Sequence, residues 1–428
     1  MVRLPMGTTS RTESARSTMK GLDLLGPEMT EQPHPYWAQL RREQPVCWDG
    51  SQTAWLITRY EDVRTGLTEP QLFSSNRIAP LLEKLAPARR AKLEPILSIM
   101  RDWMVVTDPP AHTRLRTLAN AAFRGQRIAA MKNWIAELVD GLLDEFVRSG
   151  NTDFMAGVAY PLPATVIARM LGAPQEDRDR FQRWSDELAL VAFGAGGEAR
   201  EERHERALRG VTELQEYLRE LIATLRKSPG DDMISFLLGQ QERLDDDELL
   251  SLCTLILFAG HETTTNLLCN SLVCLTQHPD QLEELRADPS LVPNAVEEVL
   301  RYEGPIKILV RWVTEDVELH GQRIRSGDRV YLVLQSANRD ERVFDDPETF
   351  DIRRPTQPVH LGFGRGPHTC LGAQLARLEV RIALPRILER LPGLRLAGDV
   401  TWKSSVATRV VEGLQVDYDS RREPAPAR

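Results

Sequence analysis

The stretch Phe363-Gly364-Arg365-Gly366-Pro367-His368-Thr369-Cys370-Leu371-Gly372 is the most informative in the chain. Its glycines and proline predict a tight, irregular loop. Cys370 is then expected to open a helix, because apolar residues follow it at helical spacing, at Leu371, Leu375, Leu378 and Ile382. Free backbone N–H groups and the helix dipole lower a thiol pKa at a helix N-terminus. The loop therefore predicts a thiolate that can bind iron, although a buried structural cysteine is the alternative for a loop taken alone.

The loop resembles the haem loop of the cytochromes P-450, F-G-x-G-x-H-x-C-x-G, and every fixed position of that pattern is met. The resemblance implies haem b (iron protoporphyrin IX) with Cys370 as the ligand of the haem iron. It also implies further haem contacts from Phe363, Gly364, His368 and Gly372. The expected fold is the cytochrome P-450 fold, mainly α with a small β portion (α+β), in one large domain. That domain is expected over 26–419, between disordered tails at 1–25 and 420–428.

The strongest helical signal runs from Asp245 to about His278. Asp245 and Glu248 have the spacing of a capping box, and Pro279 closes the pattern. Such a helix is roughly 50 Å long, and its apolar character on most faces predicts a buried central helix. Other expected elements are helices over Met131–Val147 and Glu201–Leu225 and strands over Ala54–Thr58, Val330–Leu334 and Val410–Asp417.

Midway along this helix lies Ala259-Gly260-His261-Glu262-Thr263. Thr263 can donate its hydroxyl to the Ala259 carbonyl and bend the helix. A zinc-peptidase H-E-x-x-H is excluded because position 265 is threonine, whereas a buried ion pair at Glu262 is the structural alternative. The segment is similar to the family's A-G-x-[DE]-T. The resemblance implies that Ala259 contacts the haem, that Thr263 holds a water at the oxygen-binding face, and that Glu262 links this site to solvent protons.

Two further segments match the family. Glu298 and Arg301 lie at i, i+3 on one helix face; alone this predicts an exposed ion pair, but the resemblance implies a buried network with Arg354 that supports the cysteine loop. The neighbouring Arg353 is the alternative third member. In Asp108-Pro109-Pro110-Ala111-His112-Thr113-Arg114-Leu115-Arg116, the resemblance implies that two side chains bind the haem propionates, together with two more basic residues. This set is His112, Arg116, Arg311 and His368.

Family topology also implies which residues wall the substrate pocket, namely Trp103, Val106, Leu255, Phe258, Ile306, Ile308 and Leu309. These side chains favour a hydrophobic substrate. Lys307 departs from the pattern by placing a charge in this wall. Exposure of Lys307 to solvent is the expectation, and pairing with a substrate carboxylate is the alternative.

Composition narrows the class of protein. The chain has 428 residues, a net charge of −8 and a pI near 5.7, which argues against a nucleic-acid partner. Its 5 cysteines form no C-x-x-C pair, so zinc and thioredoxin-like sites are excluded and a reducing, cytoplasmic location is expected. No apolar stretch approaches the ~20 residues that span a bilayer.

The sequence thus predicts a haem-thiolate monooxygenase of the soluble bacterial type. It is expected to activate O2 and oxidise a hydrophobic small molecule of secondary metabolism. Electrons are expected from NAD(P)H through a separate ferredoxin-type partner, and the protein is expected to be a monomer. Coupling, desaturation or rearrangement at the same site is one alternative. A non-catalytic haem-binding sensor or recruitment module is another.

Overall fold

The computed structural model describes residues 23–76, 78, 82–83, 85–192 and 200–419. Most of the two predicted tails, residues 1–22 and 420–428, lie outside the described residues. Leu24 falls within the predicted N-terminal tail but is only 2% exposed and packs against Met29 and Trp37. The packed part of the chain therefore begins before residue 26.

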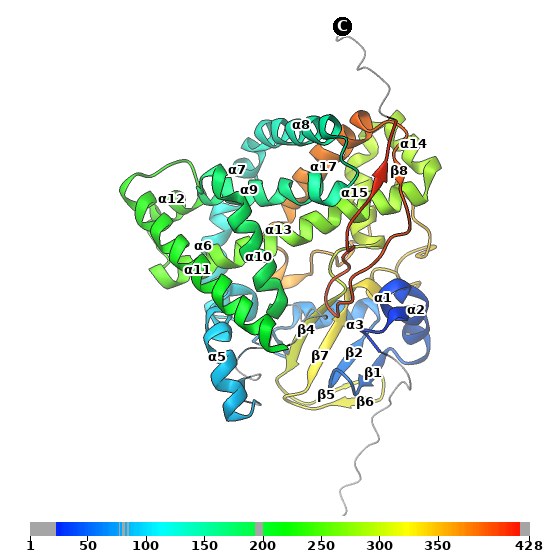
Figure 1. Ribbon diagram of the computed structural model, residues 1–428. Coiled ribbons are helices and arrows are strands. Elements are labelled where there is room, and N and C mark those ends of the chain that lie inside the picture. The colour runs from blue at the N-terminus through cyan, green and yellow to red at the C-terminus, as the bar shows by residue number, and fades with distance from the viewer. Residues whose placement is uncertain (1–22, 77, 79–81, 84, 193–199, 420–428) are drawn as a thin grey trace, which may run out of the picture.

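Helices make up most of the molecule (Figure 1). Their bounds are α1 Pro27–Glu31, α2 Pro33–Glu43, α3 Tyr60–Thr68, α5 Pro87–Arg101, α6 Ala111–Ala122, α7 Gly125–Ala130, α8 Lys132–Ser149, α9 Pro161–Leu171, α10 Arg178–Ala192, α11 Arg200–Lys227, α12 Met233–Leu238, α13 Asp246–Gln277, α14 Pro279–Ala287, α15 Val292–Tyr302, α16 Leu334–Ala337 and α17 Ala373–Arg390. The mainly helical class with a small β portion is confirmed.

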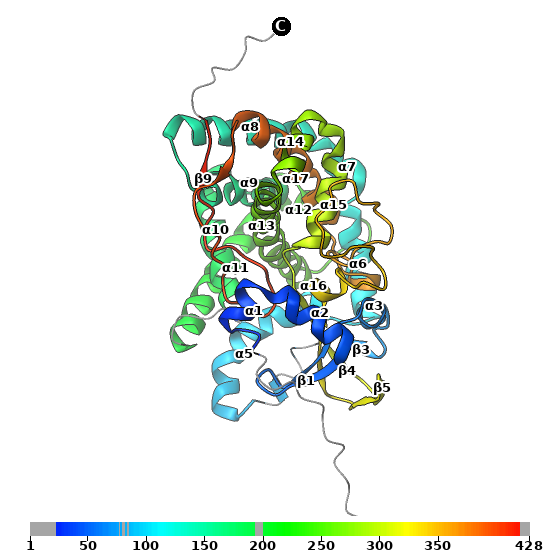
Figure 2. The ribbon, with the colours of Figure 1, turned by 90° about the vertical axis from the view of Figure 1, so that its right-hand side faces the viewer.

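The main sheet lies at one end of the molecule, beside α1, α2 and α3 (Figures 1 and 2). It has the order β1-β2-β7-β4-β3, with β2 and β7 parallel and the other neighbours antiparallel. The strands are β1 Val46–Asp49, β2 Ala54–Ile57, β3 Phe73–Ser74, β4 Ile308–Val313 and β7 Arg329–Val333. Two small ribbons pair β5 Val317–Leu319 with β6 Gln322–Ile324 and β8 Arg395–Leu396 with β9 Val416–Asp417.

The central helix α13 crosses the helical part of the fold (Figure 1) and packs against α9, α10, α15 and α17. It begins with the predicted capping box, in which Asp245 and Glu248 bond each other's backbone N–H. Its interior carries six hydroxyls that donate to the carbonyl one turn earlier, from Thr254, Thr263, Thr264, Thr265, Ser271 and Thr276. Because these polar groups are satisfied within the helix, it can lie in an apolar core.

Two sequence predictions of local structure differ from the structure. The helix after the cysteine loop begins at Ala373, with Gly372 at its N-cap, so Cys370 lies in the preceding turn. The strand predicted over Val410–Asp417 is reduced to β9 and two isolated bridges, Val411 with Trp402 and Gln415 with Asp153. Its alternating apolar residues serve instead to bury an irregular segment, as Val410, Val411 and Leu414 are at most 6% exposed.

Candidate functional site

The loop around Cys370 has a shape that requires glycine at two positions. Gly364 and Gly366 have φ angles of 69° and 72°, in a region that residues with a Cβ rarely adopt. A Cβ on Gly366 would also lie 2.8 Å from the Leu67 carbonyl oxygen of α3. The Cys370 N–H donates to the Phe363 carbonyl at 2.8 Å. The loop is therefore closed on itself and held between α3 and α17.

The sulfur of Cys370 faces a recess. Cys370 is exposed, whereas the other four cysteines are buried, and a Cβ on Gly372 would meet nothing within 4 Å. Desolvation by the surrounding protein nevertheless raises the pKa of the Cys370 thiol. A side chain that is accessible yet desolvated lies in an internal space.

Several groups oppose this effect of burial on the Cys370 thiol. Backbone N–H groups of Gly372 and Ala373 and the charges of Arg116 and Arg377 all favour the thiolate. They do not outweigh desolvation, so the predicted lowering of the thiol pKa is wrong for the polypeptide alone. The helix terminus contributes as expected, but burial is the larger influence.

Basic side chains gather beside the recess. The rings of His112 on α6 and His368 in the loop have centroids 4.0 Å apart. Within the described part of the chain, neither nitrogen of the His112 ring has a hydrogen-bond partner, nor does Nε2 of His368. Burial, followed by the charges of Arg311, His112 and Arg116, lowers the pKa of His368 to about 3. Buried polar atoms require partners, and this set suits a carboxylate.

The two arginines of this set come from different elements. Arg311 of β4 is 6% exposed and donates to the Val310 carbonyl at 2.9 Å. Arg116 of α6 is half-buried and donates from Nε to Asn120 Oδ1 at 3.0 Å. β4 also approaches the cysteine loop, because a Cβ on Gly364 would lie 3.9 Å from a methyl of Leu309. The four predicted propionate partners thus converge from α6, β4 and the loop.

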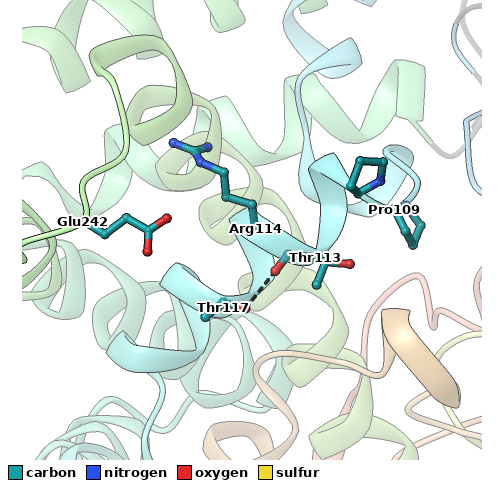
Figure 3. A pocket seen from close by; sticks show the side chains of 6 residues that line it. Pro109, Thr113, Arg114, Thr117 and Glu242 are labelled. Carbon is teal, nitrogen blue, oxygen red and sulfur yellow. Dashed lines mark hydrogen bonds between the residues drawn. The ribbon is translucent and has the colours of Figure 1, made fainter.

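A surface depression of about 690 Å³ lies on α6 (Figure 3). Pro109, Pro110, Thr113, Arg114, Thr117 and Glu242 line it. Thr113 and Thr117 are exposed, and Arg114 is already paired with Glu248 at 2.5 Å. His112, by contrast, is buried on another face of the helix. The depression is therefore separate from the recess at Cys370.

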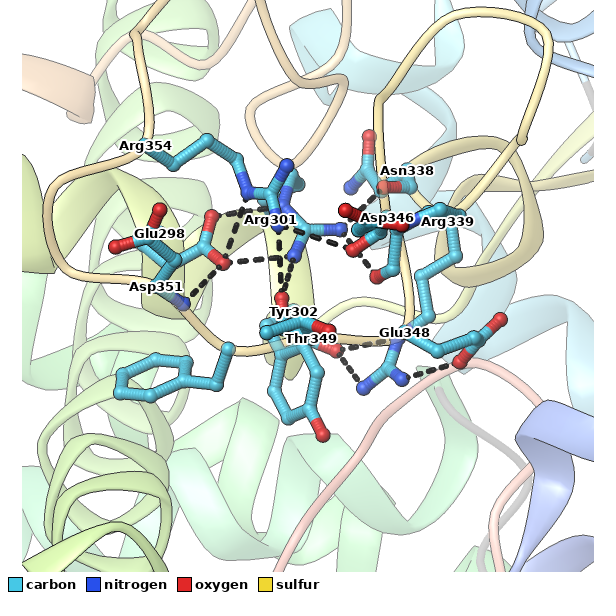
Figure 4. A network of polar contacts seen from close by, with 12 residues as sticks. Glu298, Arg301, Tyr302, Asn338, Arg339, Asp346, Glu348, Thr349, Asp351 and Arg354 are labelled. Atoms are coloured by element: carbon cyan, nitrogen blue, oxygen red, sulfur yellow. Dashed lines mark hydrogen bonds and ion pairs between the residues drawn. The ribbon is translucent and has the colours of Figure 1, made fainter.

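The Glu298–Arg301 pair is buried, with side-chain exposures of 2% and 3%, so the exposed ion pair that the spacing alone predicts is wrong. Both Glu298 oxygens accept from Arg301 at 2.7 Å, and Arg354 Nε donates to Glu298 at 3.2 Å (Figure 4). Arg301 also donates to the carbonyls of Asn338, Pro347 and Thr349. Helix α15 is thereby fixed to the segment that leads into the cysteine loop.

Arg354 and Arg353 are clearly distinguished by their contacts. Arg354 joins Glu298 and the carbonyls of Asp345, Asp346 and Thr349. Arg353 instead pairs with Glu284 of α14, and its side chain is 60% exposed. The structure therefore places Arg354, and not Arg353, in the network (Figure 4).

Thr263 on α13 adopts the predicted arrangement, since its hydroxyl donates to the Ala259 carbonyl at 2.9 Å. Ala259 is exposed although residues 249–258 of the same helix are buried, which indicates that this turn borders a recess. A Cβ on Gly260 would lie 2.7 Å from Ile167 of α9. Glycine therefore allows α9 to approach α13 at the turn that carries the alcohol.

Glu262 has neighbours that the sequence did not indicate. Burial raises the pKa of Glu262 to about 7, with Lys403 opposing the shift and Asp186 adding to it. Asp186 accepts a hydrogen bond from the Tyr160 hydroxyl at 2.7 Å, and its pKa is raised by burial. These residues come from three segments far apart in the chain, so no local pattern could have grouped them.

The family model for cytochrome P450 matches residues 24–392 of the chain. The chain belongs to the cytochrome P450 family. Cytochrome P450 monooxygenase PikC of Streptomyces venezuelae is 37% identical over 438 residues, covering 99% of each chain. Nocardicin C N-oxygenase of Nocardia uniformis is 40% identical over 396 residues, covering 90% of this chain and 95% of that protein.

Solved structures agree with this assignment. The crystal structure of P450BioI with hexadec-9Z-enoic acid ligated acyl carrier protein has a TM-score of 0.85 and 35% identity, covering 92% of this chain and 100% of that one. The protein is accordingly a P450 monooxygenase, an oxidoreductase that uses haem iron and O2 and incorporates oxygen. In the described ranges, this P450 has no helix that is long and apolar enough to cross a membrane.

The residues at the recess fit a haem. An accessible sulfur lies at Cys370, open space lies beside Gly372, and the unpartnered nitrogens of His112 and His368 lie next to two arginines. Haem presents an iron that takes a sulfur ligand and two carboxylates that require cationic partners. The donor set of this P450 meets both needs.

The predicted pocket wall is only partly consistent with the structure. Leu309 and Ile306 are half-buried on one side of the main sheet, but Ile308 is 2% exposed and packs with Leu24 and Trp37 on the opposite side. Alternation along β4 explains the difference between Ile308 and Leu309, whereas Ile306 precedes the strand. Ile308 is therefore better described as part of the core than as a pocket residue.

The remaining candidates for the pocket wall lie along α13 and the segment before α6. Trp103 stacks on Phe258 with ring centroids 5.1 Å apart. Trp103 and Val106 are 0% and 2% exposed, and Leu255 and Phe258 are 7% and 6% exposed. These four side chains form an apolar layer of the core next to the turn at Ala259.

Lys307 is buried, with 4% exposure, so the expectation that it faces solvent is wrong. Its ammonium donates to the Ser405 carbonyl. Desolvation and the charge of Arg409 lower its pKa to about 7, although Glu303 opposes the shift. Glu303 already accepts from Arg409, His34 and Gln335, so within the described residues no carboxylate is hydrogen-bonded to Lys307.

Replacing Lys307 by methionine is expected to stabilise this P450 near neutral pH. The folded-state pKa of about 7 lies below the ordinary lysine value of 10.5. The folded chain therefore binds fewer protons than the unfolded chain between these values, and stability rises with pH through that window. The Lys307→Met variant should not show this rise. Its free energy of unfolding at pH 7 should be roughly 2 kcal/mol higher than that of the unaltered protein, a figure that includes the loss of the hydrogen bond to Ser405. Urea unfolding at a series of pH values from 6.5 to 9.5 measures the free energy of unfolding of both proteins. The same dependence on pH in Lys307→Met as in the unaltered protein would contradict the prediction.

Proposed function

We propose that this P450 inserts one atom of O2 into a hydrophobic small molecule of secondary metabolism. Haem b is held through Cys370, and electrons come from NAD(P)H through a separate ferredoxin-type protein. The observation that supports this most directly is the accessible sulfur of Cys370 in a recess bordered by basic side chains. We further propose that the protein acts as a monomer in the cytoplasm, where its free cysteines stay reduced.

Each predicted residue has a role in this proposal. Cys370 is the metal ligand, and the loop from Phe363 to Gly372 surrounds the sulfur. His112, Arg116, Arg311 and His368 bind the propionates, because the two arginines supply positive charge and, among the described residues, ring nitrogens of the two histidines have no partner. The haem iron supplies O2 activation when bound. Glu298, Arg301 and Arg354 keep the cysteine loop in place and contact no substrate.

Proton delivery is assigned to Thr263 and Glu262. The hydroxyl of Thr263 donates to the Ala259 carbonyl, so its lone pairs stay available to accept from a water. Glu262 has a pKa of about 7 and can therefore take up and release a proton near neutral pH. Asp186 and Lys403 act on Glu262 and connect it towards the Tyr160–Asp186 hydrogen bond. We propose that protons enter along this side of α13.

A Thr263→Ala variant is expected to uncouple electron consumption from product formation. Loss of the hydroxyl removes the acceptor that positions a water as proton donor, and a positioned proton donor is typically worth about 10²- to 10⁴-fold in rate. Product formed per NAD(P)H oxidised should fall roughly tenfold, while O2 consumption continues as peroxide release. Thr265→Ala is the matched control, since Thr265 is 2% exposed and its hydroxyl donates back to the His261 carbonyl. Full coupling in Thr263→Ala would exclude the proton-delivery role.

The substrate class follows from the apolar side chains of Leu255 and Phe258 next to the turn at Ala259 and of Leu309 beside the cysteine loop. PikC and nocardicin C N-oxygenase, which carry oxygenase names, support a role in secondary metabolism. A panel of hydrophobic compounds, tested for those that convert low-spin to high-spin iron, would identify ligands of this pocket. Oxidation of such a ligand by a surrogate ferredoxin system would then identify the product.

The proposed function is tested first by the spectrum of the purified protein. The reduced protein under carbon monoxide is expected to show the strongly red-shifted Soret band of a thiolate-bound haem. A band typical of histidine-bound haem, or no haem at all, would overturn the proposal. Incorporation of labelled O2 into product then separates monooxygenation from desaturation, coupling and rearrangement.

A further inference from the structure

A second charged network borders the cysteine loop and is separate from the Glu298–Arg301 pair. It is centred on Glu297 of α15, whose side chain is 16% exposed. Arg377 of α17 donates from Nε and Nη2 to the two Glu297 oxygens at 2.7 Å each. Arg381, one turn further along α17, donates to the same carboxylate at 3.1 Å. Paired donors from one guanidinium fix both the position and the orientation of Arg377.

His360 connects the same carboxylate to the start of the loop. His360 Nε2 lies 3.1 Å from Glu297 Oε2, and His360 Nδ1 accepts from the Gly362 N–H at 3.0 Å. The backbone donor at Nδ1 assigns the ring proton to Nε2, which therefore donates to Glu297. A Cβ on Gly362 would lie 2.9 Å from the Leu300 carbonyl oxygen. The loop thus enters in direct contact with α15.

Arg377 continues this chain of contacts to the cysteine. Its guanidinium lies over the Phe363 ring, 4.4 Å from the centroid, in the geometry of a cation–π contact. The Phe363 carbonyl accepts the Cys370 N–H at 2.8 Å. Glu297 is therefore linked to the backbone of Cys370 through Arg377 and Phe363.

The network also carries an electrostatic balance. Burial acts to raise the pKa of Glu297, but hydrogen bonds from Arg377 and His360 and the charge of Arg377 lower it to about 2. Glu297 is therefore an anion at neutral pH. Arg377 is one of the two cations whose charge favours the Cys370 thiolate, together with Arg116. The Glu297 carboxylate directly offsets the charge of Arg377.

We propose that Glu297 is a positioning residue that sets how strongly Cys370 donates electrons to the haem iron. It does so by holding Arg377 over Phe363 and by neutralising a charge that otherwise stabilises the sulfur anion. This inference rests on the proposed binding of haem iron by Cys370. Removal of the carboxylate leaves positive charge beside the thiolate, which favours the reduced, less positive iron. Removal of the guanidinium has the opposite effect.

The test compares Glu297→Gln and Arg377→Gln in the haem-loaded protein, by anaerobic reduction against a dye of known potential. The equilibrium constant for reduction should rise in Glu297→Gln and fall in Arg377→Gln. A unit charge at this kind of separation and partial burial corresponds to roughly a 3- to 10-fold change. Glu297→Asp, which keeps the charge, should lie close to the unaltered protein. A role limited to loop packing would move both neutral variants in the same direction.

Glu284→Gln is the control for a general effect of charge, because Glu284 pairs with the exposed Arg353. Arg381→Gln provides a second route if Glu297→Gln does not retain haem. Its side chain is 38% exposed, and its removal should lower the equilibrium constant by a smaller factor than Arg377→Gln. Shifts of the same sign in Glu297→Gln and Arg377→Gln, or shifts no larger than the control, overturn the inference. Unaltered protein without a thiolate-type Soret band would overturn the proposed function as well.

Discussion

A Cys370→Ala variant is expected to lose monooxygenase turnover completely and to show no thiolate-type Soret band when it is reduced under carbon monoxide. The reason is that alanine offers no sulfur to the iron, while the rest of the recess is unchanged. The basic cluster at His112 and His368 can still bind the propionates. Haem content, measured after denaturation, should therefore fall less than activity does.

Cys47→Ala is the matched control for Cys370→Ala. Cys47 is a free cysteine on β1, and it is only 1% exposed. Its replacement by alanine removes one buried sulfur and should cost about 1 kcal/mol of stability, with the spectrum and turnover unchanged. Turnover that persisted in Cys370→Ala would show that Cys370 is not the iron ligand.

An Arg301→Ala variant is expected to lose about 3–5 kcal/mol of folding stability, because it leaves the buried Glu298 carboxylate without its main partner. Arg301 makes five hydrogen bonds, two to Glu298 and three to backbone carbonyls. Of the described residues, Arg354 through Nε and Asp351 through its N–H would then still donate to Glu298. Urea unfolding of the purified variant, together with the yield of haem-loaded protein, measures the loss.

Arg353→Ala provides the comparison on the surface of the same region. Its partner Glu284 is 33% exposed and Arg353 is 60% exposed, so its removal should change stability by less than about 1 kcal/mol. If Arg301→Ala were destabilised by no more than Arg353→Ala, the buried network would not be what supports the loop.

The sequence predicted the fold correctly where the same residue pattern determines both the local structure of a segment and its burial. The capping box at Asp245 and the apolar run that follows it place α13 within one residue at either end. The glycines of the cysteine loop predict an irregular turn for the same reason that the structure requires them, a positive φ at Gly364 and Gly366.

The outcomes that sequence did not predict depend on tertiary contacts. The spacing of Glu298 and Arg301 predicts that they share a helix face but not that this face is buried. Burial determines how much stability is lost when one partner of the pair is removed. The pKa of the Cys370 thiol depends on desolvation that no local motif encodes. Likewise, Lys307 is enclosed only because the segment around Ser405 folds over it.

The site residues that the sequence did not predict also depend on tertiary contacts. Asp186 and Lys403 reach Glu262 from α10 and from a loop near the C-terminus, and Glu297 meets Arg377 eighty positions away along the chain. The adjacent acids Glu297 and Glu298 were a visible signal, because two carboxylates in one helix that supports a buried loop require separate cationic partners.

The hydroxyls of α13 have a consequence for how this enzyme can diversify. Because Thr254, Thr264 and Thr265 bond to the helix's own carbonyls, the neighbouring helices α9 and α10 need not provide polar partners for them. Apolar side chains on those neighbours can change in size or shape without leaving a hydroxyl unsatisfied in the core. The apolar surroundings of α13 can therefore vary while Thr263 keeps its bond to the Ala259 carbonyl.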